Sequence, residues 1–493
     1  MQRLSRHKNS PKYLIHPKVT VALQVTVTSL LIQYSPMNLS FLKDRSFLRE
    51  LLVIAVPISF QQLLSASLNM IDVIMVGQLG ETSIAALGLS NQVFFVLILI
   101  LFGTTSGMAI FTAQYWGKQE LEPIRKVLGM SLIVSVSIAF IFTLVALLIP
   151  ETALGFYTKD AEVIAIGSSY LRIVGFTYIP SAIATAYIAV LRSIQLIRLT
   201  VVATIVALVF KTILGYGLIF GIAGLPALGV RGAAIGTAAG WTLELILLLV
   251  LIYTQKTPLA ANPLTFFSFD KPFFLRVLKT ASPAVANELF WSLGITTYNA
   301  IYAHIGTEAI AAINVNATIE ELGFVVFIGL GNACSVLVGN RIGAGQKEES
   351  YEIVRRVVIL GVAFAVGVGF IIFLLRDAVV GLYELSPSGE TNVRWLLLVM
   401  ACTLWIRMFN FTVFIGALRA GGDTRFALLM EFASMWLVGV PAAYVGAFVF
   451  HLPVYLVYLM VMLEELTKAF ISGWRFRSRK WIHDLVNVPG VAS

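Results

Sequence analysis

Charged residues inside long apolar stretches are the part of this 493-residue chain that could do chemistry. Asp72, Lys211 and Glu288 each stand within an apolar run long enough to cross a bilayer. An ionised group at the centre of such a helix costs about 3 kcal/mol, so it normally faces a partner or a water-filled cavity. We therefore take Asp72, Lys211 and Glu288 as candidate ion-coupling residues. Asp72 or Glu288 would be the ligand if the coupled ion were Na⁺.

Other polar and aromatic residues of the apolar runs are candidate contacts for a substrate. Pro283 can kink the helix one turn before Glu288 and so open a cavity-lining position, where a carboxylate would attract a cation. An aromatic ring at such a position could stack on an organic molecule, although packing or a hydrogen bond to a neighbouring helix is the alternative for each residue. The candidates are Glu288, Tyr298, Trp291, Gln62, Glu244 and Glu320.

Neighbouring charges restrict these assignments. Glu320 and Glu321 diverge by about 100° on a helix, so they cannot both point the same way. Glu431 is a further acid within a predicted span, and Arg407 is a candidate partner for one of these three acids. Arg192 and Arg419 fall at corresponding ends of two apolar runs, where we expect them to anchor the chain to lipid headgroups.

The composition places these residues in a membrane. The chain is 58% hydrophobic and 12% charged, whereas a soluble chain carries about 25% charged residues. Spanning segments in lipid must be helices unless they close into a barrel, and the short alternating runs of a barrel are absent from the sequence. We predict an all-α polytopic membrane protein with twelve spans, at about 51–76, 84–115, 127–149, 163–190, 198–222, 231–254, 274–303, 309–340, 353–375, 392–418, 426–449 and 453–474.

The basic residues predict the orientation of these spans. With the N-terminus in the cytoplasm, 28 of the 35 basic residues fall on the cytoplasmic side and four on the opposite side. This positive-inside bias puts both termini in the cytoplasm, and it explains the net charge of +9 without a nucleic-acid partner.

The chain also repeats itself. Residues 51–117 align with residues 277–343 at an offset of 226 without a gap, matching Pro57 with Pro283, Gly103 with Gly329 and Gly117 with Gly343. Leu191-Arg192 recurs as Leu418-Arg419 at an offset of 227. Six spans return the second half to the same orientation, so we predict two six-helix bundles related by a pseudo-two-fold axis along the membrane normal.

These patterns divide the chain into five parts. They are a cytoplasmic tail (1–45), a six-helix bundle (46–254), a cytoplasmic connector (255–273), a second six-helix bundle (274–475) and a cytoplasmic tail (476–493). The stretch 19–33 is too short and polar to cross a bilayer. Our hypothesis is that translation starts at Met37.

Several motifs resemble the multidrug and toxic compound extrusion (MATE) family across about residues 45–480. They include Asp72-Val-Ile-Met-Val-Gly77, Ala113-Gln-Tyr-Trp-Gly117, Gly339-Asn-Arg-Ile-Gly343 and Leu418-Arg-Ala-Gly-Gly-Asp423-Thr-Arg425. The resemblance implies a cation-coupled exporter that alternates between two states around a cavity between the bundles. Many members carry an Asn and an acid in the fifth span, where Lys211 and Gly215 stand here. Asp72 with Lys211 resembles a bacterial subgroup, and the alternative is a static pair that only fixes packing.

We therefore expect an antiporter of the inner membrane that exports small, amphipathic, cationic compounds and works as a monomer among membrane lipids. The five histidines have no metal-ligand spacing and the sequence contains no phosphate-binding glycine loop, so we expect neither an enzyme nor a cofactor. An H⁺ or Na⁺ gradient would then supply the energy. The alternative is a lipid-linked oligosaccharide flippase of the same superfamily, although its cavity would be strongly basic.

Overall fold

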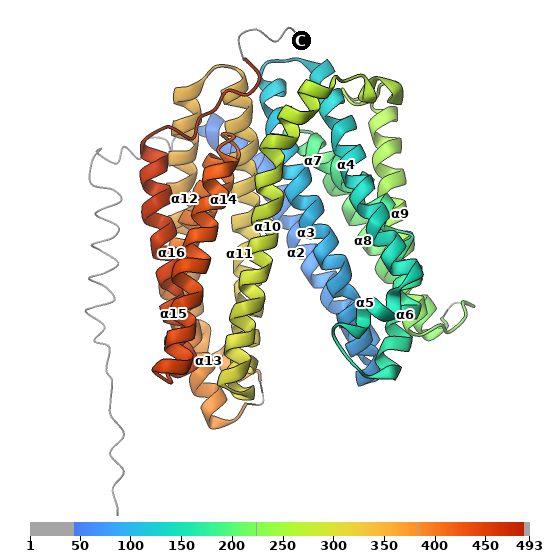
Figure 1. Ribbon diagram of the computed structural model, residues 1–493, viewed down its shortest axis with the longest axis vertical. Helices are drawn as coiled ribbons and strands as arrows, with labels where there is room; N and C mark the ends of the chain where they lie inside the picture. The colour runs from blue at the N-terminus through green and yellow to red at the C-terminus, as the bar shows by residue number, and fades with distance from the viewer. Residues whose placement is uncertain (1–43, 223, 384, 488–493) are drawn as a thin grey trace, which may run out of the picture. The chain divides into compact units, whose positions relative to one another are not determined.

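The computed structural model describes residues 44–222, 224–383 and 385–487. The hypothetical start at Met37 and most of the predicted N-terminal tail lie outside these residues. The described residues from Ser46 onward form one compact unit, and its described secondary structure is helical throughout (Figure 1).

Eight helices form the first half of this unit. They are α2 (Arg45–Gly77), α3 (Glu81–Gly117), α4 (Leu121–Leu148), α5 (Pro150–Gly155), α6 (Ala161–Gly175), α7 (Tyr178–Ser193), α8 (Ile197–Phe220) and α9 (Val230–Thr254). A bend of 51° separates α6 from α7. The predicted fourth span is therefore a broken helix.

The second half follows a connector that contains the 3₁₀-helix η2 (Pro263–Phe267). Its long helices are α10 (Lys271–Ile305), α11 (Thr307–Gly343), α12 (Lys347–Val380), α13 (Pro387–Phe411) and α16 (Val454–Arg477). Between α13 and α16 the chain alternates π-helical and α-helical segments, namely η3 (Thr412–Arg419), α14 (Thr424–Phe432), η4 (Ala433–Gly439), α15 (Val440–Tyr444) and η5 (Val445–Val449).

The helices repeat in the order that the sequence predicts. Helices α10, α11, α12 and α13 each begin 226 residues after α2, α3, α4 and α6, respectively. The offset between matched residues is 227 at Arg419, which matches Arg192. Helix α13 continues directly into η3 before this position. Because a π-helical turn bonds residue i to residue i+5, it can absorb one extra residue without breaking the helix.

The apolar helices confirm a membrane protein. Within the described residues, nine helices are long and apolar enough to cross a bilayer, or ten if α6 and α7 together make one span. Helices α10 and α16 have 35 and 24 residues but fall outside this set. The number of twelve spans therefore stays a prediction.

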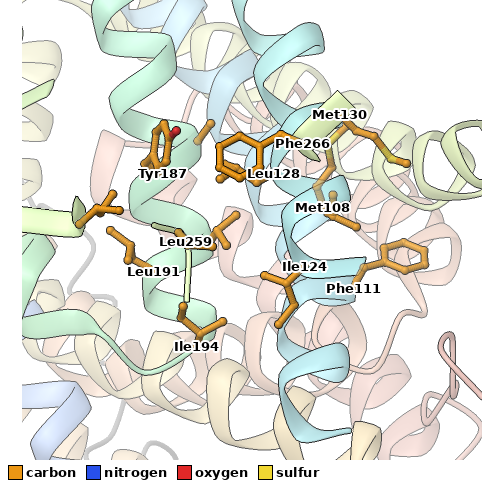
Figure 2. Packing of buried hydrophobic residues seen from close by; sticks show 14 of the residues in the cluster. Met108, Phe111, Ile124, Leu128, Met130, Tyr187, Leu191, Ile194, Leu259 and Phe266 are labelled. Carbon is orange, nitrogen blue, oxygen red and sulfur yellow. The ribbon is translucent and has the colours of Figure 1, made fainter. Parts of the chain in front are cut away.

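Buried apolar side chains fasten the connector to the first half. Leu259 and Phe266 are at most 1% exposed and belong to a core cluster with Leu128 and Tyr187 (Figure 2). The connector backbone is held as well, because Arg125 Nε donates a 2.9 Å hydrogen bond to the carbonyl oxygen of Pro258. The connector is thus held against α4 and α7.

The two halves meet backbone to backbone where α3 and α11 end. A Cβ added at Gly117 would overlap the carbonyl oxygen of Asn340, and a Cβ added at Gly343 would overlap the carbonyl oxygen of Gln114. Since Gly117 and Gln114 correspond to Gly343 and Asn340 in the repeat, the contact is reciprocal. The matched glycines Gly117 and Gly343 thus allow a close contact between the halves.

Two further matched positions extend this contact along the helices. A Cβ at Gly103 of α3 would lie 2.7 Å from Cα of Val285 in α10. A Cβ at Gly329 of α11 would lie 2.6 Å from the carbonyl oxygen of Ala55 in α2. These contacts use the C-terminal parts of α3 and α11 and the N-terminal parts of α2 and α10, so they belong to one end of the unit.

At that end the segment after α16 crosses from the second half to the first. Trp481 is fully buried, and the backbone N–H of His483 donates a 2.9 Å bond to the carbonyl of Gly421. The side chain of Gln114 in α3 then donates to the carbonyl of His483 at 3.0 Å and accepts from the N–H of Leu485 at 2.9 Å. We call residues 479–487 the strap.

The buried carboxylate of Asp423 holds the strap in place. Asp423 accepts a 2.7 Å bond from Arg475 Nε and lies 3.6 Å from His483 Nε2. Burial would raise the pKa of Asp423, but the bonds from His483 and Arg475 outweigh it and hold the pKa below its ordinary value. The carboxylate is therefore charged, and stabilises the strap, at neutral pH.

We expect Gly117→Ala to lower the thermal unfolding midpoint of the purified protein, because the added methyl collides with the Asn340 carbonyl. Overpacking of this kind costs about 1–3 kcal/mol. Gly88→Ala is the matched control, since Gly88 lies exposed in the same helix with open space around its Cβ position. Equal midpoints for the two variants would contradict the close contact.

We expect Asp423→Asn to release the strap and reduce the hydrogen-exchange protection of the His483 and Leu485 amides several-fold. In the wild type the lowered pKa of Asp423 stabilises the strap above about pH 4, the ordinary value for Asp, and this stabilisation is lost as the pH falls through the lowered pKa. Glu348→Gln is the control, because its ion pair with Arg479 is exposed. Unchanged protection in Asp423→Asn would show that the carboxylate does not hold the strap.

Candidate functional site

The structure brings Asp72 and Lys211 together in the first half. Lys211 Nζ of α8 lies 2.7 Å from Asp72 Oδ2 of α2, and about a fifth of each side chain is exposed. Both helices are apolar around this pair, so each charge depends on the other for neutralisation. A cation that binds Asp72 must compete with the lysine.

Helix α9 packs closely against α8 at Lys211. A Cβ at Gly240 would lie 2.8 Å from Cβ of Lys211, and a Cβ at Gly236 would lie 2.8 Å from Cα of Gly215. The two glycines let α9 approach α8 closely, so the lysine stem has backbone on one side. This packing directs its ammonium group toward α2.

The first half contains two more polar contacts between its helices. Glu244 of α9 is 5% exposed and accepts a 2.5 Å hydrogen bond from Thr204 Oγ1 of α8. Arg192 at the end of α7 donates a 3.0 Å bond to Gln61 Oε1 of α2. Glu244 is thus held between helices, with Arg192 near enough for their charges to interact.

Glu288 has a separate partner in the second half. Arg419 Nη2 of η3 lies 2.6 Å from Glu288 Oε1 of α10, and the two residues are 4% and 9% exposed. Arg419 also donates to Ser106 Oγ of α3 at 3.4 Å and lies over the rings of Phe102 and Phe414. The pair therefore sits where the halves meet, apart from the Asp72–Lys211 pair.

The expectation that Arg419 anchors the chain to lipid headgroups is wrong, because its guanidinium is buried on Glu288. Arg192 also turns inward, to Gln61. The two arginines correspond in the repeat, and each contacts the first helix of its own half. Arg192 donates to Gln61, and Arg419 donates to Glu288, which follows Asn287, the counterpart of Gln61. A position near the end of a helix does not reveal which way the side chain points.

The second half also buries a larger group of charges. Lys468 Nζ of α16 lies 2.8 Å from Glu431, 2.6 Å from Glu464 and 3.8 Å from Glu465. We call these four residues the Lys468 cluster. Glu320 of α11 pairs instead with Arg407 of α13, as the sequence suggested, whereas Glu321 is exposed.

The remaining candidates are dispersed. Tyr298 is 5% exposed and donates its hydroxyl hydrogen bond to Glu464, so it is not open to a substrate in this arrangement. Trp291 is 37% exposed on α10, and Gln62 is half-buried on α2. Their roles as substrate contacts stay predictions.

Sequence reasoning missed two cations, Arg419 and Lys468. Lys468 is not among the candidate residues of the sequence, yet it is buried inside α16. A signal was present, because Glu464 and Lys468 are four residues apart and therefore share one helix face within an apolar run. Within a predicted span, this spacing allows the lysine to be paired inside the helix bundle.

Comparison with known proteins agrees with this arrangement. The MatE family model matches residues 57–217 and again residues 283–445, with the two matches beginning 226 residues apart. The uncharacterized transporter YisQ of Bacillus subtilis is 25% identical over 86% of this chain and 93% of its own length. The probable multidrug resistance protein NorM of Rhizobium meliloti is 29% identical over 87% and 92%.

Solved structures share the fold. A MATE transporter in its straight conformation superposes with a TM-score of 0.80 at 18% identity, over 87% of this chain and 95% of the other. An outward-facing multidrug resistance MATE transporter gives a TM-score of 0.79 at 19% identity, with the same coverage. Because the family model covers well over half of the sequence, this chain belongs to the MatE family of multidrug and toxic compound extrusion transporters.

Proposed function

We propose that the protein is a secondary active exporter of small, amphipathic, cationic compounds, driven by an H⁺ or Na⁺ gradient. The observation that carries this proposal is the Asp72–Lys211 pair, a carboxylate balanced by one lysine within apolar helices. The NorM relatives are named as multidrug resistance proteins. The protein itself has no enzymatic role in this scheme.

The pair can couple an ion to a change of state. A proton or Na⁺ at Asp72 would neutralise the carboxylate and free Lys211, which α8 would then have to move toward water or another acid. A ligand shifts a conformational balance only through its different affinity for the two states, and breaking this pair provides such a difference. Glu288 would act in the second half in the same way through Arg419.

The proposal includes twelve spans in two six-helix bundles, with α10 and α16 completing the set. Both helices are long enough to cross, and their charges face inward: Glu288 to Arg419, and Glu464 to Lys468. The reciprocal contact at Gly117 and Gly343 supports a pseudo-two-fold axis along the membrane normal. We place this contact and both termini on the cytoplasmic side of the inner membrane, which makes the structure a state closed to the cytoplasm.

The buried charges favour a cationic cargo. The carboxylates of Glu244, Glu288, Glu320 and the Lys468 cluster outnumber the basic groups among them. A flippase for anionic lipid-linked sugars would need the opposite balance. We propose that one copy of the chain, in contact with lipid, carries out the full cycle.

The test compares Asp72→Asn, Lys211→Met and the double variant in proteoliposomes with an imposed H⁺ or Na⁺ gradient and a cationic dye as cargo. Each single variant leaves one charge unpaired, which costs roughly 3 kcal/mol, so both should unfold at lower temperature. The double variant removes both charges and should regain stability. It should nevertheless lose at least tenfold of the gradient-driven efflux, because the ion-binding carboxylate is gone.

Asp377→Asn is the control, because this acid pairs with Arg394 in an exposed position. It should transport like the wild type. Gradient-driven efflux at the wild-type rate in the double variant would mean that the pair only fixes packing. Efflux of an anionic lipid-linked sugar instead of the dye would favour the flippase.

A further inference from the structure

The Lys468 cluster contains more acid than base. One ammonium group faces three carboxylates, those of Glu431, Glu464 and Glu465, at 2.6–3.8 Å. Lys468, Glu464 and Glu431 are 6%, 3% and 7% exposed. With all three acids ionised, the cluster would carry two uncompensated negative charges inside an apolar bundle.

The surrounding helices do not supply the missing positive charge. Arg407 is the other cation facing the cluster among the described residues, and Glu320 already takes its charge. The remaining neighbours are neutral hydroxyl and amide groups. The polar and titratable groups that surround the cluster are Tyr298 and Tyr302 on α10, Asn316 and Glu320 on α11, Arg407 and Asn410 on α13, and Tyr458 on α16.

Unpaired buried charges of one sign are not stable at such distances. Two carboxylates that share a dry site cannot both stay ionised, and an acid in this position takes up a proton instead. A metal ion would need the space between the three acids, but the ammonium group of Lys468 occupies it. A proton needs no such space.

An unsatisfied acceptor independently points to the same ligand. Asn410, 6% exposed, donates from Nδ2 to a carboxylate oxygen of Glu465 at 2.7 Å, while its own Oδ1 is buried without a donor. Ionised carboxylates have no hydrogen to donate, whereas a protonated carboxyl group has an O–H that could serve this amide oxygen.

From this geometry we propose that the Lys468 cluster is a proton-binding site of the second half that takes up to two protons. Each proton comes from water, forms an O–H bond on a carboxylate oxygen and returns to water when the site empties. Glu465, whose side chain is 18% exposed, is the entry point. As a second coupling site beside Asp72, the cluster deepens the proposed function and rests on it for its role in transport.

The cluster is connected to the helix that carries Glu288. Tyr298 of α10 donates to Glu464, and Gly439 of η4 packs against both side chains. Protonation of Glu464 weakens its hold on the tyrosine hydroxyl, because a neutral carboxyl group is a weaker acceptor than a carboxylate. Proton occupancy therefore changes the contact between α10 and α16 in a half whose π-helical segments already depart from regular helix.

Infrared spectroscopy of the purified full-length protein tests the proposal without transport. The wild type at neutral pH should show the carbonyl stretch of protonated carboxyl groups. Glu431→Gln, Glu464→Gln and Glu465→Gln should each remove up to about half of this band, because one proton acceptor is lost. Glu321→Gln, which alters an exposed acid of α11, should leave the band unchanged.

Absence of the band from the wild type would overturn the proposal even if a variant failed to fold. A band of undiminished intensity in all three variants would overturn it as well. Replacing choline with Na⁺ in the buffer should not alter the band, and loss of the band in Na⁺ would assign the site to a metal cation. Failure of gradient-driven efflux, with the band behaving as expected, would refute the proposed transport and leave the proton site intact.

Discussion

A charge inside an apolar helix bundle must be neutralised close to where it stands, and this requirement organises the polar interior of the protein. The first half meets it with single pairs, such as Asp72 with Lys211. The second half pairs Glu288 with Arg419 and Glu320 with Arg407, then gathers three carboxylates around Lys468. Each arrangement links two or more helices, so a change in one charge is felt as a change in helix packing.

The scaffold that carries these charges is symmetric, whereas the charges are not. Gly117 and Gly343 make the same contact from opposite sides, since each accommodates a carbonyl oxygen of the other half. Lys211 has Val438 at the corresponding place in the second half. The two halves therefore share backbone contacts and differ in their buried charges.

The sequence predicted the scaffold better than the site. Glycines and prolines repeat in the sequence because backbone contacts and helix bends depend on them directly, and two of the glycine pairs matched in the overlay lie at close contacts between the halves. Asp72 and Lys211 were also found, since an isolated charge in an apolar run is conspicuous. The partners of Arg419 and Lys468 were missed, because a charge near a helix end is compatible with either the lipid surface or the interior. The π-helical turn that positions Arg419 is a property of the folded backbone, and a one-residue change of offset was its sole trace in the sequence.

Gln114 makes two contacts at once at the end of the unit where the strap lies. Its carbonyl oxygen lies against Gly343 while its amide side chain holds the strap through His483 and Leu485. The two fastenings share one residue, so α3 cannot leave α11 without loosening the strap. Separation of α3 from α11 would therefore also disturb the strap, and the indole of Trp481, buried at the root of the strap, would report that change through its fluorescence.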